Sequence, residues 1–597
     1  MPRLALTRKY RAISPESSMN LDFPRLRSGN VSLRYFVLVM SIVGFGKFEA
    51  VAEEKPFNPR GISGSILLHG GQTADEDSVR RFLELAGGAE QAKVAVLTGL
   101  ADDNPIDPLA ILRFWKEQGV KDVTISQPDK RVTRNDEELL ERLKTVTGVW
   151  ILDGSRDSLL NAFARSPVEA SLKELLKRGG VVAGIGRGAE LIGSRVQLND
   201  QDSVAGLDLL PDSMIRTDID QTSSDLRVMG GHVGYSLPPN AALLVGCDPG
   251  QLDLRNRRAY GGGNLDRGRT IYTLGTDPVT VSLAKSSQRP AMSAQVPPNR
   301  VVDLTALRRS AHERHTNDFP PVKTGVPEVP NGTLVIIGGG GMPKDIVQAI
   351  IDAAGGPDAK YVVLPTAVPE LLAMRSGVPR FFPQFGALDV TVLPQVGHEQ
   401  VSRKAYLKTI READCLWFGG GRQWRFVDAY AGSPAVDEFH AVLKRGGVVC
   451  GSSAGASIQG EYLARANPLG NLDIMAEGYE RGFGFLPGVA IDQHFSQRNR
   501  FDDLLQLVKT YPQFLGIGID EATAIMVRGH VATVLGDHHV FFLDADPIDA
   551  STRQVRVTKL EAGDRYDLKL RRHILDEKQP AVAEPAASRN LKSQRNQ

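Results

Sequence analysis

The sequence is poor in cysteine and carries no excess charge of either sign. Its 597 residues include only Cys247, Cys415 and Cys450, too few for a disulfide framework, and their apolar surroundings favour buried, unreactive side chains. Lys and Arg number 71 against 70 Asp and Glu, so the formal net charge is +1. Such a balance gives no general attraction to nucleic acid or anionic membranes, and an ionic substrate must be recognised by a local site.

Long hydrophobic runs are equally scarce. The one notable run is Tyr35–Phe45, which follows Arg25, Arg27 and Arg34 and precedes an Ala-x-Ala sequence ending at Ala52. This order predicts a secretory signal over residues 1–52, cleaved after Ala52, and a secreted or periplasmic protein with no stable membrane insertion after cleavage. Translation starting at Met19 and an uncleaved anchor remain open as well.

Metal-ligand patterns are also lacking. The sequences His312-Glu-Arg-His315 and His538-His539 have no Cys, Asp or Glu partners at the spacing that metal sites use. We therefore expect neither a metal nor a cofactor.

An internal repeat organises the chain. The heptapeptide Leu-Lys-Arg-Gly-Gly-Val-Val occurs at Leu176–Val182 and again 267 residues later at Leu443–Val449. Further matches at this offset indicate a tandem duplication. The expected domains are two copies of one fold, a connecting linker rich in Pro, Ser, Arg and His, and a disordered tail, spanning 60–285, 331–575, 286–330 and 576–597 respectively.

Each copy alternates short apolar strands with amphipathic helices. In the second copy, strands are predicted at 334–337, 361–364, 390–393, 415–418 and 447–450, and helices at 344–354, 401–412 and 435–444. Continuous apolar strands separated by helices predict an α/β fold with a mostly parallel sheet covered on both faces. Functional sites of such sheets form beyond the carboxyl ends of the strands.

A candidate nucleophile follows the last of these strands. Residues 451–455 read Gly-Ser-Ser-Ala-Gly, a Gly-x-Ser-x-Gly pattern in which small residues permit a sharp strand-to-helix turn that exposes Ser453. The N–H of Ala454 could stabilise an oxyanion, and an N–H of Gly420 or Gly421 could be the second donor. A glycine-rich turn that serves packing alone is the alternative.

A candidate base follows another apolar strand. His494 stands at its end, where an imidazole can activate a serine hydroxyl. Gln423 could hold a substrate amide, and Arg498 and Arg500 could bind carboxylates or be solvated surface. A further buried strand, at 516–519, is followed by Asp520 and Glu521.

The three motifs Gly-x-Ser-Ala-Gly-Ala, Asp-Gln-His-Phe-x-x-Arg-x-Arg and Gly-Ile-Gly-Ile-Asp-Glu, in that order, resemble cyanophycinase and the wider dipeptidase E family of serine peptidases. The resemblance implies a flavodoxin-like or class I glutaminase-like three-layer fold. It implies Ser453 as nucleophile, His494 as base, and Gly421 and Ala454 as oxyanion donors. It also implies a peptide substrate, as in cyanophycin, a poly-aspartate with isopeptide-linked arginines, and a pocket formed by Gln423, Asp492, Gln493, Arg498 and Arg500.

Three positions depart from this family's pattern or leave it open. Asp503 stands where the family pocket has a further Arg, and Arg422 stands where an acid usually precedes the pocket Gln. The family carries its triad acid between Ser and His. Asp473 lies closest to that place in this sequence, and Glu477, Glu461 and Asn471 are also candidates.

The first copy lacks the reactive groups. At the offset of 267, Ser453 aligns with Gly186 and Gln423 with Arg156. We expect a degenerate domain that keeps the fold, with a pseudo-dimer contact inside the chain or a homodimer between chains. The chain is then expected to be a secreted serine-type peptidase of the cyanophycinase class that cleaves Asp-containing peptides. An aspartyl dipeptidase and a non-catalytic secreted binding protein are the two rival hypotheses.

Overall fold

The computed structural model describes residues 57–99, 107–126, 137–217, 226–246, 268–316, 319–369, 382–393, 397–545 and 554–575. The predicted signal, the predicted tail and Cys247 lie outside these ranges. None of the helices described is long and apolar enough to span a bilayer. Below, the described residues up to 316 are called the first half and those from 319 the second half.

The first half contains an eight-stranded and a six-stranded sheet. The larger has the order β14-β11-β10-β1-β5-β4-β2-β3, with β1 Ser65–His69, β2 Lys93–Leu97, β3 Asp122–Ser126, β4 Gly148–Ile151, β5 Val181–Ile185, β10 Ala241–Val245, β11 Thr270–Gly275 and β14 Val301–Asp303. The smaller has the order β13-β12-β9-β8-β6-β7, with β6 Gly193–Gln197, β7 Ser203–Ala205, β8 Leu210–Arg216, β9 Val233–Ser236, β12 Val279–Leu283 and β13 Met292–Val296. The helices are α1 Glu76–Leu85, α2 Pro108–Glu117, α3 Glu137–Leu143, α4 Arg156–Phe163, α5 Pro167–Lys177, α6 Arg187–Ile192 and α7 Leu304–Thr316.

The second half contains a nine-stranded and a five-stranded sheet. The larger has the order β17-β16-β18-β19-β15-β23-β24-β27-β28, with β15 Val329–Ile337, β16 Lys360–Leu364, β17 Asp389–Val392, β18 Cys415–Phe418, β19 Val448–Ser452, β23 Thr523–Gly529, β24 Val531–Gly536, β27 Arg565–Asp567 and β28 Arg572–Ile574. The smaller has the order β20-β21-β22-β25-β26, with β20 Gly460–Tyr462, β21 Leu486–Gln493, β22 Leu515–Ile519, β25 Val540–Ala545 and β26 Val555–Leu560. The helices are α8 Lys344–Ala354, α11 His398–Val401, α12 Lys404–Arg411, α13 Trp424–Tyr430, α14 Pro434–Lys444, α15 Ala454–Ser457 and α16 Phe501–Thr510.

The predicted α/β fold is confirmed, but the large sheets are mixed. Strands β17, β16, β18, β19 and β15 run parallel, whereas β23 joins β15 antiparallel and begins an antiparallel extension. The cause is local. Only His530 separates β23 from β24, and a connection this short can join only antiparallel strands.

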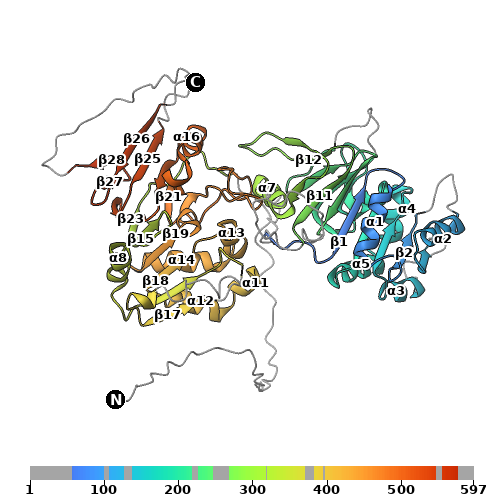
Figure 1. The fold of residues 1–597 in the computed structure, drawn as a ribbon. Coiled ribbons are helices and arrows are strands. Elements are labelled where there is room, and N and C mark those ends of the chain that lie inside the picture. The colour runs from blue at the N-terminus through green and yellow to red at the C-terminus, as the bar shows by residue number, and fades with distance from the viewer. Residues whose placement is uncertain are drawn as a thin grey trace, which may run out of the picture. The chain divides into compact units, whose positions relative to one another are not determined.

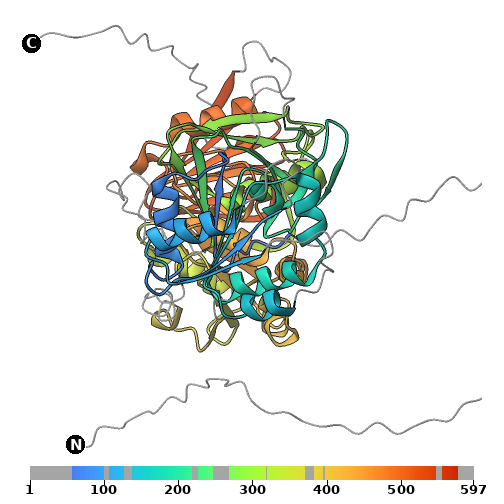
Figure 2. The same cartoon turned by 90° about the vertical axis from the view of Figure 1, so that its right-hand side faces the viewer.

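Apolar side chains leave both faces of the parallel strands. In β15, Leu334 and Ile336 belong to one core, which also contains side chains of α12 and α14, whereas Val335 and Ile337 belong to another, which contains side chains of α8. Figures 1 and 2 show helices on both sides of the strands. Burial on both faces explains why these strands are continuously hydrophobic in sequence.

Equivalent elements recur at a constant spacing. The starts of β2 and β16, β4 and β18, β5 and β19, and α5 and α14 are each 267 residues apart. The order of the first five strands of the nine-stranded sheet, β17-β16-β18-β19-β15, matches the order β3-β2-β4-β5-β1 in the first half.

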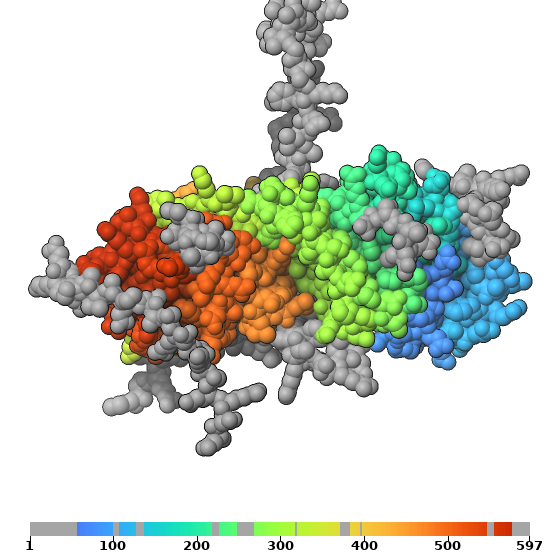
Figure 3. All heavy atoms as spheres, turned by 90° about the horizontal axis from the view of Figure 1, so that it is seen from above, coloured from blue at the N-terminus to red at the C-terminus, as the bar shows by residue number. Residues whose placement is uncertain are grey.

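The segment predicted as a linker, 286–330, is not one. It contributes β13 to the six-stranded sheet, β14 to the eight-stranded sheet, and helix α7. Its arginines misled the prediction because they are paired: Arg308 Nη2 lies 2.7 Å from Asp212 Oδ2 and Arg309 Nη2 lies 2.8 Å from Asp428 Oδ1. In Figure 3 the light-green surface around residue 300 adjoins the orange surface of later residues, in agreement with the Arg314–Glu477 ion pair.

Candidate active site

Ser453 stands on the sharp turn between β19 and α15. Its backbone has φ 58° and ψ −114°, a left-handed conformation that costs energy in a non-glycine residue. The flanking glycines are sterically required: a Cβ at Gly451 would lie 2.4 Å from the Gly455 carbonyl oxygen, and one at Gly455 would lie 1.9 Å from that of Phe418. The Ser453 N–H donates to the Ile337 carbonyl oxygen at 3.0 Å. The turn is thereby fixed to the end of β15, with the hydroxyl beyond the strand ends.

His494 directly follows β21 and reaches the serine. The Ser453 Oγ lies 2.8 Å from His494 Nε2. The histidine is held by its own backbone N–H, which donates to the Gly338 carbonyl oxygen at 2.8 Å. Its ring packs on Gly339, where an added Cβ would lie 2.3 Å from His494 Cε1. The glycines after β15 therefore make room for the imidazole.

The far nitrogen of the imidazole meets Glu521. The Glu521 Oε1 lies 2.6 Å from His494 Nδ1. A carboxylate can only accept, so Nδ1 carries the proton and Nε2 is left to accept from the serine hydroxyl. Glu521 is held in turn by its backbone N–H, which donates to Gln497 Oε1 at 3.0 Å.

The predicted triad acids are wrong. Asp473 Oδ2 accepts from Asn467 Nδ2 at 2.8 Å, and Glu477 pairs with Arg314 and Arg289. The two remaining candidates are engaged elsewhere as well: Glu461 accepts the Gly488 N–H, and the Asn471 carbonyl oxygen accepts from Arg465.

The sequence held a signal for Glu521. Strands β21 and β22 are parallel neighbours with Gln493 opposite Ile519, so the residues that follow the two strands lie side by side. His494 follows the first strand, and Asp520 and Glu521 follow the second. The prediction failed because it placed the acid between the serine and the histidine in the chain.

Burial governs the protonation of His494. Desolvation lowers the pKa of His494 below its ordinary value, and the charges of Arg498 and Arg500 lower it further, while the hydrogen bond to Glu521 acts in the opposite direction. The imidazole is therefore neutral at neutral pH and able to accept a proton.

The hydrolysis rate should follow this titration. We expect kcat/KM to be constant near neutral pH and to fall about tenfold per pH unit below the lowered pKa of His494, since protonation removes the acceptor. Arg498→Gln should move the inflection to higher pH because it removes a repelling charge, and the exposed Arg403→Gln is the control. A pH profile with its inflection above 7 in the wild type would contradict this assignment.

The glycine loop after β18 runs beside the serine. A Cβ at Gly420 would lie 3.4 Å from Ser453 Cβ, and one at Gly421, whose φ is 144°, would lie 2.4 Å from the Ala367 carbonyl oxygen. The N–H of Arg422 donates to that same carbonyl at 2.8 Å. The loop is thus pinned close to Ser453 and Ala454, the arrangement in which two backbone N–H groups can face one oxyanion.

The first half shows the same turn without a nucleophile. Gly186, after β5, has φ 51° and ψ −130°. The Arg187 N–H, which matches that of Ala454, donates to Asp153 Oδ1 at 2.8 Å. A Cβ at Gly186 would lie 2.6 Å from the same oxygen. An anionic oxygen therefore occupies the place beyond the turn and excludes any side chain at position 186.

The predicted pocket residues are partly engaged with one another. Gln423 Nε2 donates to the carbonyl oxygens of Ala464 and Arg465 at 2.8 Å. Asp492 is fully buried and accepts from Arg465 and Arg500. Burial lowers the pKa of Arg500 to about 10.

Two predicted pocket residues remain available. Gln493 Oε1 is buried and accepts no hydrogen bond from the residues described. Arg498 is exposed, near enough to His494 for its charge to lower the pKa of the imidazole. These groups offer an acceptor and a cation to a substrate.

The two charge reversals are compensated within the protein. Arg422 Nη2 donates to the carbonyl oxygens of Asn467 and Gly470, at 2.6 and 2.8 Å. Asp503 Oδ2 lies 2.6 Å from Arg465 Nη2. Arg465 is buried with φ 59° and bridges Asp492 and Asp503, a role that no sequence motif indicated.

Metal chemistry finds no ligand set here. Within the part of the chain that the structure describes, no group of three or more His, Cys, Asp or Glu side chains is placed to hold an ion.

Comparisons with known proteins agree with this geometry. The sequence model of peptidase family S51 matches residues 334–535. A cyanophycinase from Geminocystis herdmanii is 30% identical over 243 residues, which are 38% of this chain and 89% of the relative. One from Synechococcus elongatus is 29% identical over 285 residues, 46% of this chain and 87% of the relative. A solved peptidase from an acI-B1 actinobacterium is 21% identical with a TM-score of 0.33, covering 40% of this chain and 97% of its own.

A serine, a histidine and a glycine-rich loop at the strand ends, in a segment that matches peptidases, define a serine-type peptidase that acts on peptide or polypeptide substrates. The chain belongs to peptidase family S51.

Proposed function

We propose that the second half hydrolyses an amide or isopeptide bond through an acyl-enzyme on Ser453. The observation that carries the proposal is the chain of contacts from Ser453 Oγ to His494 Nε2 at 2.8 Å and from His494 Nδ1 to Glu521 Oε1 at 2.6 Å. His494 takes the hydroxyl proton as the oxygen attacks the carbonyl carbon and returns it to the leaving amine. Water then attacks the ester, with His494 again as base.

The N–H groups of Gly421 and Ala454 hold the oxyanion in this proposal. Support comes from the first half, where Asp153 Oδ1 accepts the N–H that corresponds to that of Ala454. That carboxylate oxygen lies where the tetrahedral oxyanion would lie in the second half. Glu521 holds the imidazole in the required tautomer and stabilises its charged form during the reaction.

The proposed substrate is an Asp-containing peptide. Arg498 can pair with a substrate carboxylate, and the unpartnered Gln493 Oε1 can accept a substrate N–H. Cyanophycin itself is one candidate because of the relatives' names. An aspartyl dipeptide is the second, since Asp503 and Arg465 neutralise each other beside the pocket and leave it fewer free cations.

A substrate panel tests this specificity. With insoluble cyanophycin, Asp-X dipeptides and matched Asn-X dipeptides, we expect Asp-containing substrates to be cut at least about tenfold faster than Asn-containing ones, because a lost charge pair costs about a factor of ten or more. Asp503→Arg should raise the rate on cyanophycin relative to dipeptides. Equal rates on Asp-X and Asn-X would refute the carboxylate preference while leaving the mechanism intact.

We also infer that the two halves are a tandem duplication and that the first has lost catalysis. The shared spacing of 267 residues, the matching strand order and the Gly186 turn support this origin. Asp153 occupies the reactive place of the first half. Contacts such as that between Arg269 and Asp428 support an internal pseudo-dimer in place of a homodimer.

Export of the chain is a further proposal. It rests on the basic residues, the apolar run and the Ala-x-Ala sequence before residue 53. Amino-terminal sequencing of the mature protein should begin at Glu53, and a mature chain that begins at Met1 or Met19 would contradict cleavage.

A further inference from the structure

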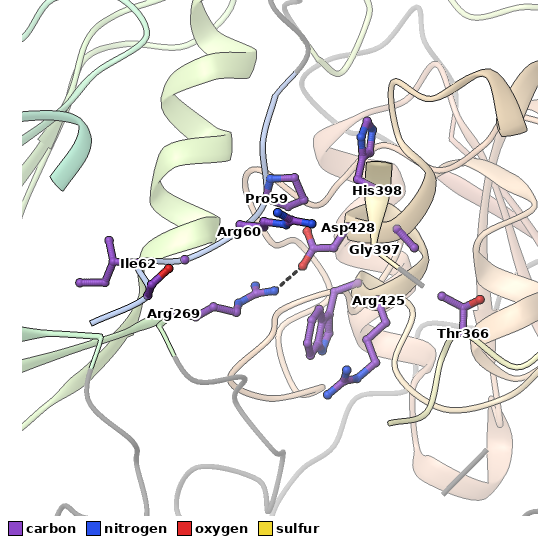
Figure 4. Close-up of a pocket in the computed structure, with 13 residues that line it drawn as sticks. Pro59, Arg60, Ile62, Arg269, Thr366, Gly397, His398, Arg425 and Asp428 are labelled. Atoms are coloured by element: carbon purple, nitrogen blue, oxygen red, sulfur yellow. Dashed lines mark hydrogen bonds and ion pairs between the residues drawn. The ribbon is translucent and has the colours of Figure 1, made fainter. Parts of the chain in front are cut away.

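A pocket of about 410 Å³ lies away from Ser453, where the first half meets the second. One wall comes from residues 59–63 and Arg269, outside the segment that matches the peptidase family. The opposite wall comes from Thr366, residues 397–398 and helix α13 (Figure 4). Its volume falls in the range of small-molecule sites.

Guanidinium groups gather around this pocket. Arg269 is buried, donates from Nε and Nη2 to Asp303, and pairs through Nη1 with Asp428, the contact drawn dashed in Figure 4. Arg425 lines the opposite side. Arg60 lies at the rim, where its exposed side chain makes only a 3.4 Å contact with the exposed Glu399. An exposed pair of this kind is weak, so Arg60 can turn to a ligand at little cost.

Trp424 supplies an independent sign of a missing partner. Its ring lies between Arg269 and Arg425, each guanidinium carbon being 4.5 Å from the ring centroid. Only 3% of the side chain is exposed, and the indole Nε1–H donates to none of the residues described. A buried donor without an acceptor costs free energy, so a ligand oxygen at this position would be favoured.

We propose that this pocket binds a small dicarboxylate of amino-acid or dipeptide size. One carboxylate pairs with Arg60 at the rim and the other accepts the Trp424 indole N–H near Arg425. Planar guanidinium groups match carboxylates in two-point geometry, whereas the arginines leave no acceptor for a cationic ligand other than carboxylates already paired.

The position of the pocket couples it to catalysis. Helix α13 begins immediately after Gln423, whose side chain holds the Ala464 and Arg465 carbonyls beside the substrate pocket. On the pocket side, the same helix carries Trp424, Arg425 and Asp428. A ligand held here therefore bears on an element of the active site without occupying it.

Calorimetric titration with succinate tests the proposal on the full chain carrying Ser453→Ala, so that no turnover interferes. We expect saturable binding to one site, weakened at least tenfold by Arg60→Glu, which reverses the rim charge, and by Ser63→Phe, which fills the pocket from an exposed position. The exposed Arg300→Glu is the matched control and should bind as the parent does.

The remaining arms separate this pocket from the catalytic one. Arg498→Gln, which alters the proposed substrate site, should leave succinate binding unchanged. Loss of binding in Arg498→Gln with retention in Arg60→Glu and Ser63→Phe would place succinate in the active site and overturn the proposal. No saturable binding of succinate, or binding of inorganic phosphate in its stead, would overturn it as well.

Discussion

Ser453→Ala is expected to lower kcat/KM for peptide hydrolysis by a factor of at least about 10⁴, because removal of the nucleophile of a serine hydrolase costs this much or more. The variant keeps the small residue that the tight turn demands, and Ala at φ 58° is no larger than Ser. The fold should therefore persist, and the loss should appear in the rate alone.

Two measurements accompany that rate. Thermal unfolding should place the free energy of unfolding of Ser453→Ala within about 1 kcal/mol of the wild type, as for substitutions that create no cavity. The exposed Ser402→Ala serves as the matched control and should retain full activity. A Ser453→Ala protein that folds and still turns over substrate at more than about a hundredth of the wild-type rate would exclude the serine mechanism.

Glu521→Gln is expected to reduce kcat by about 10²–10⁴-fold with a smaller change in KM. The amide that replaces the carboxylate can donate to His494 Nδ1, which places the imidazole proton on Nε2. In that tautomer the nitrogen facing Ser453 at 2.8 Å cannot accept the hydroxyl proton. The pH profile should change with it, because the hydrogen bond from Glu521 acts to raise the pKa of His494.

Asp473→Asn is the matched control for the triad acid. Asp473 is exposed and its carboxylate contacts Asn467, so this substitution should leave kcat unchanged within a factor of about two, as expected for a surface change. If Asp473→Asn lost the activity and Glu521→Gln kept it, the contact seen at His494 Nδ1 would not be the functional one.

Much of the second half could be predicted from its sequence because two periodicities coincide there. The helix at 344–354 and the strand at 415–418 begin and end where the apolar pattern predicted. The segment 286–330 was misjudged for a different reason. Its strands are short, and the arginines of α7 are buried by pairing with Asp212 and Asp428, partners distant in sequence.

The reactive pair was predictable because each member follows its strand directly. Ser453 and His494 were recognised from motif and position alone, and the structure brings them together. Glu521 was missed since which strands are neighbours is a property of the sheet, not of the chain order. The same holds for Arg465, whose partners Asp492 and Asp503 approach it only through the folded chain.

The central claim is that Ser453 becomes covalently acylated. Its most direct test is the reaction of the folded protein with a fluorophosphonate, followed by mass spectrometry of the peptide that contains residues 447–457. We predict one adduct per chain, located on Ser453, at a rate that falls sharply in Glu521→Gln and is unaffected by Asp473→Asn. An unlabelled Ser453 in folded, active protein would contradict an acyl-enzyme on this residue.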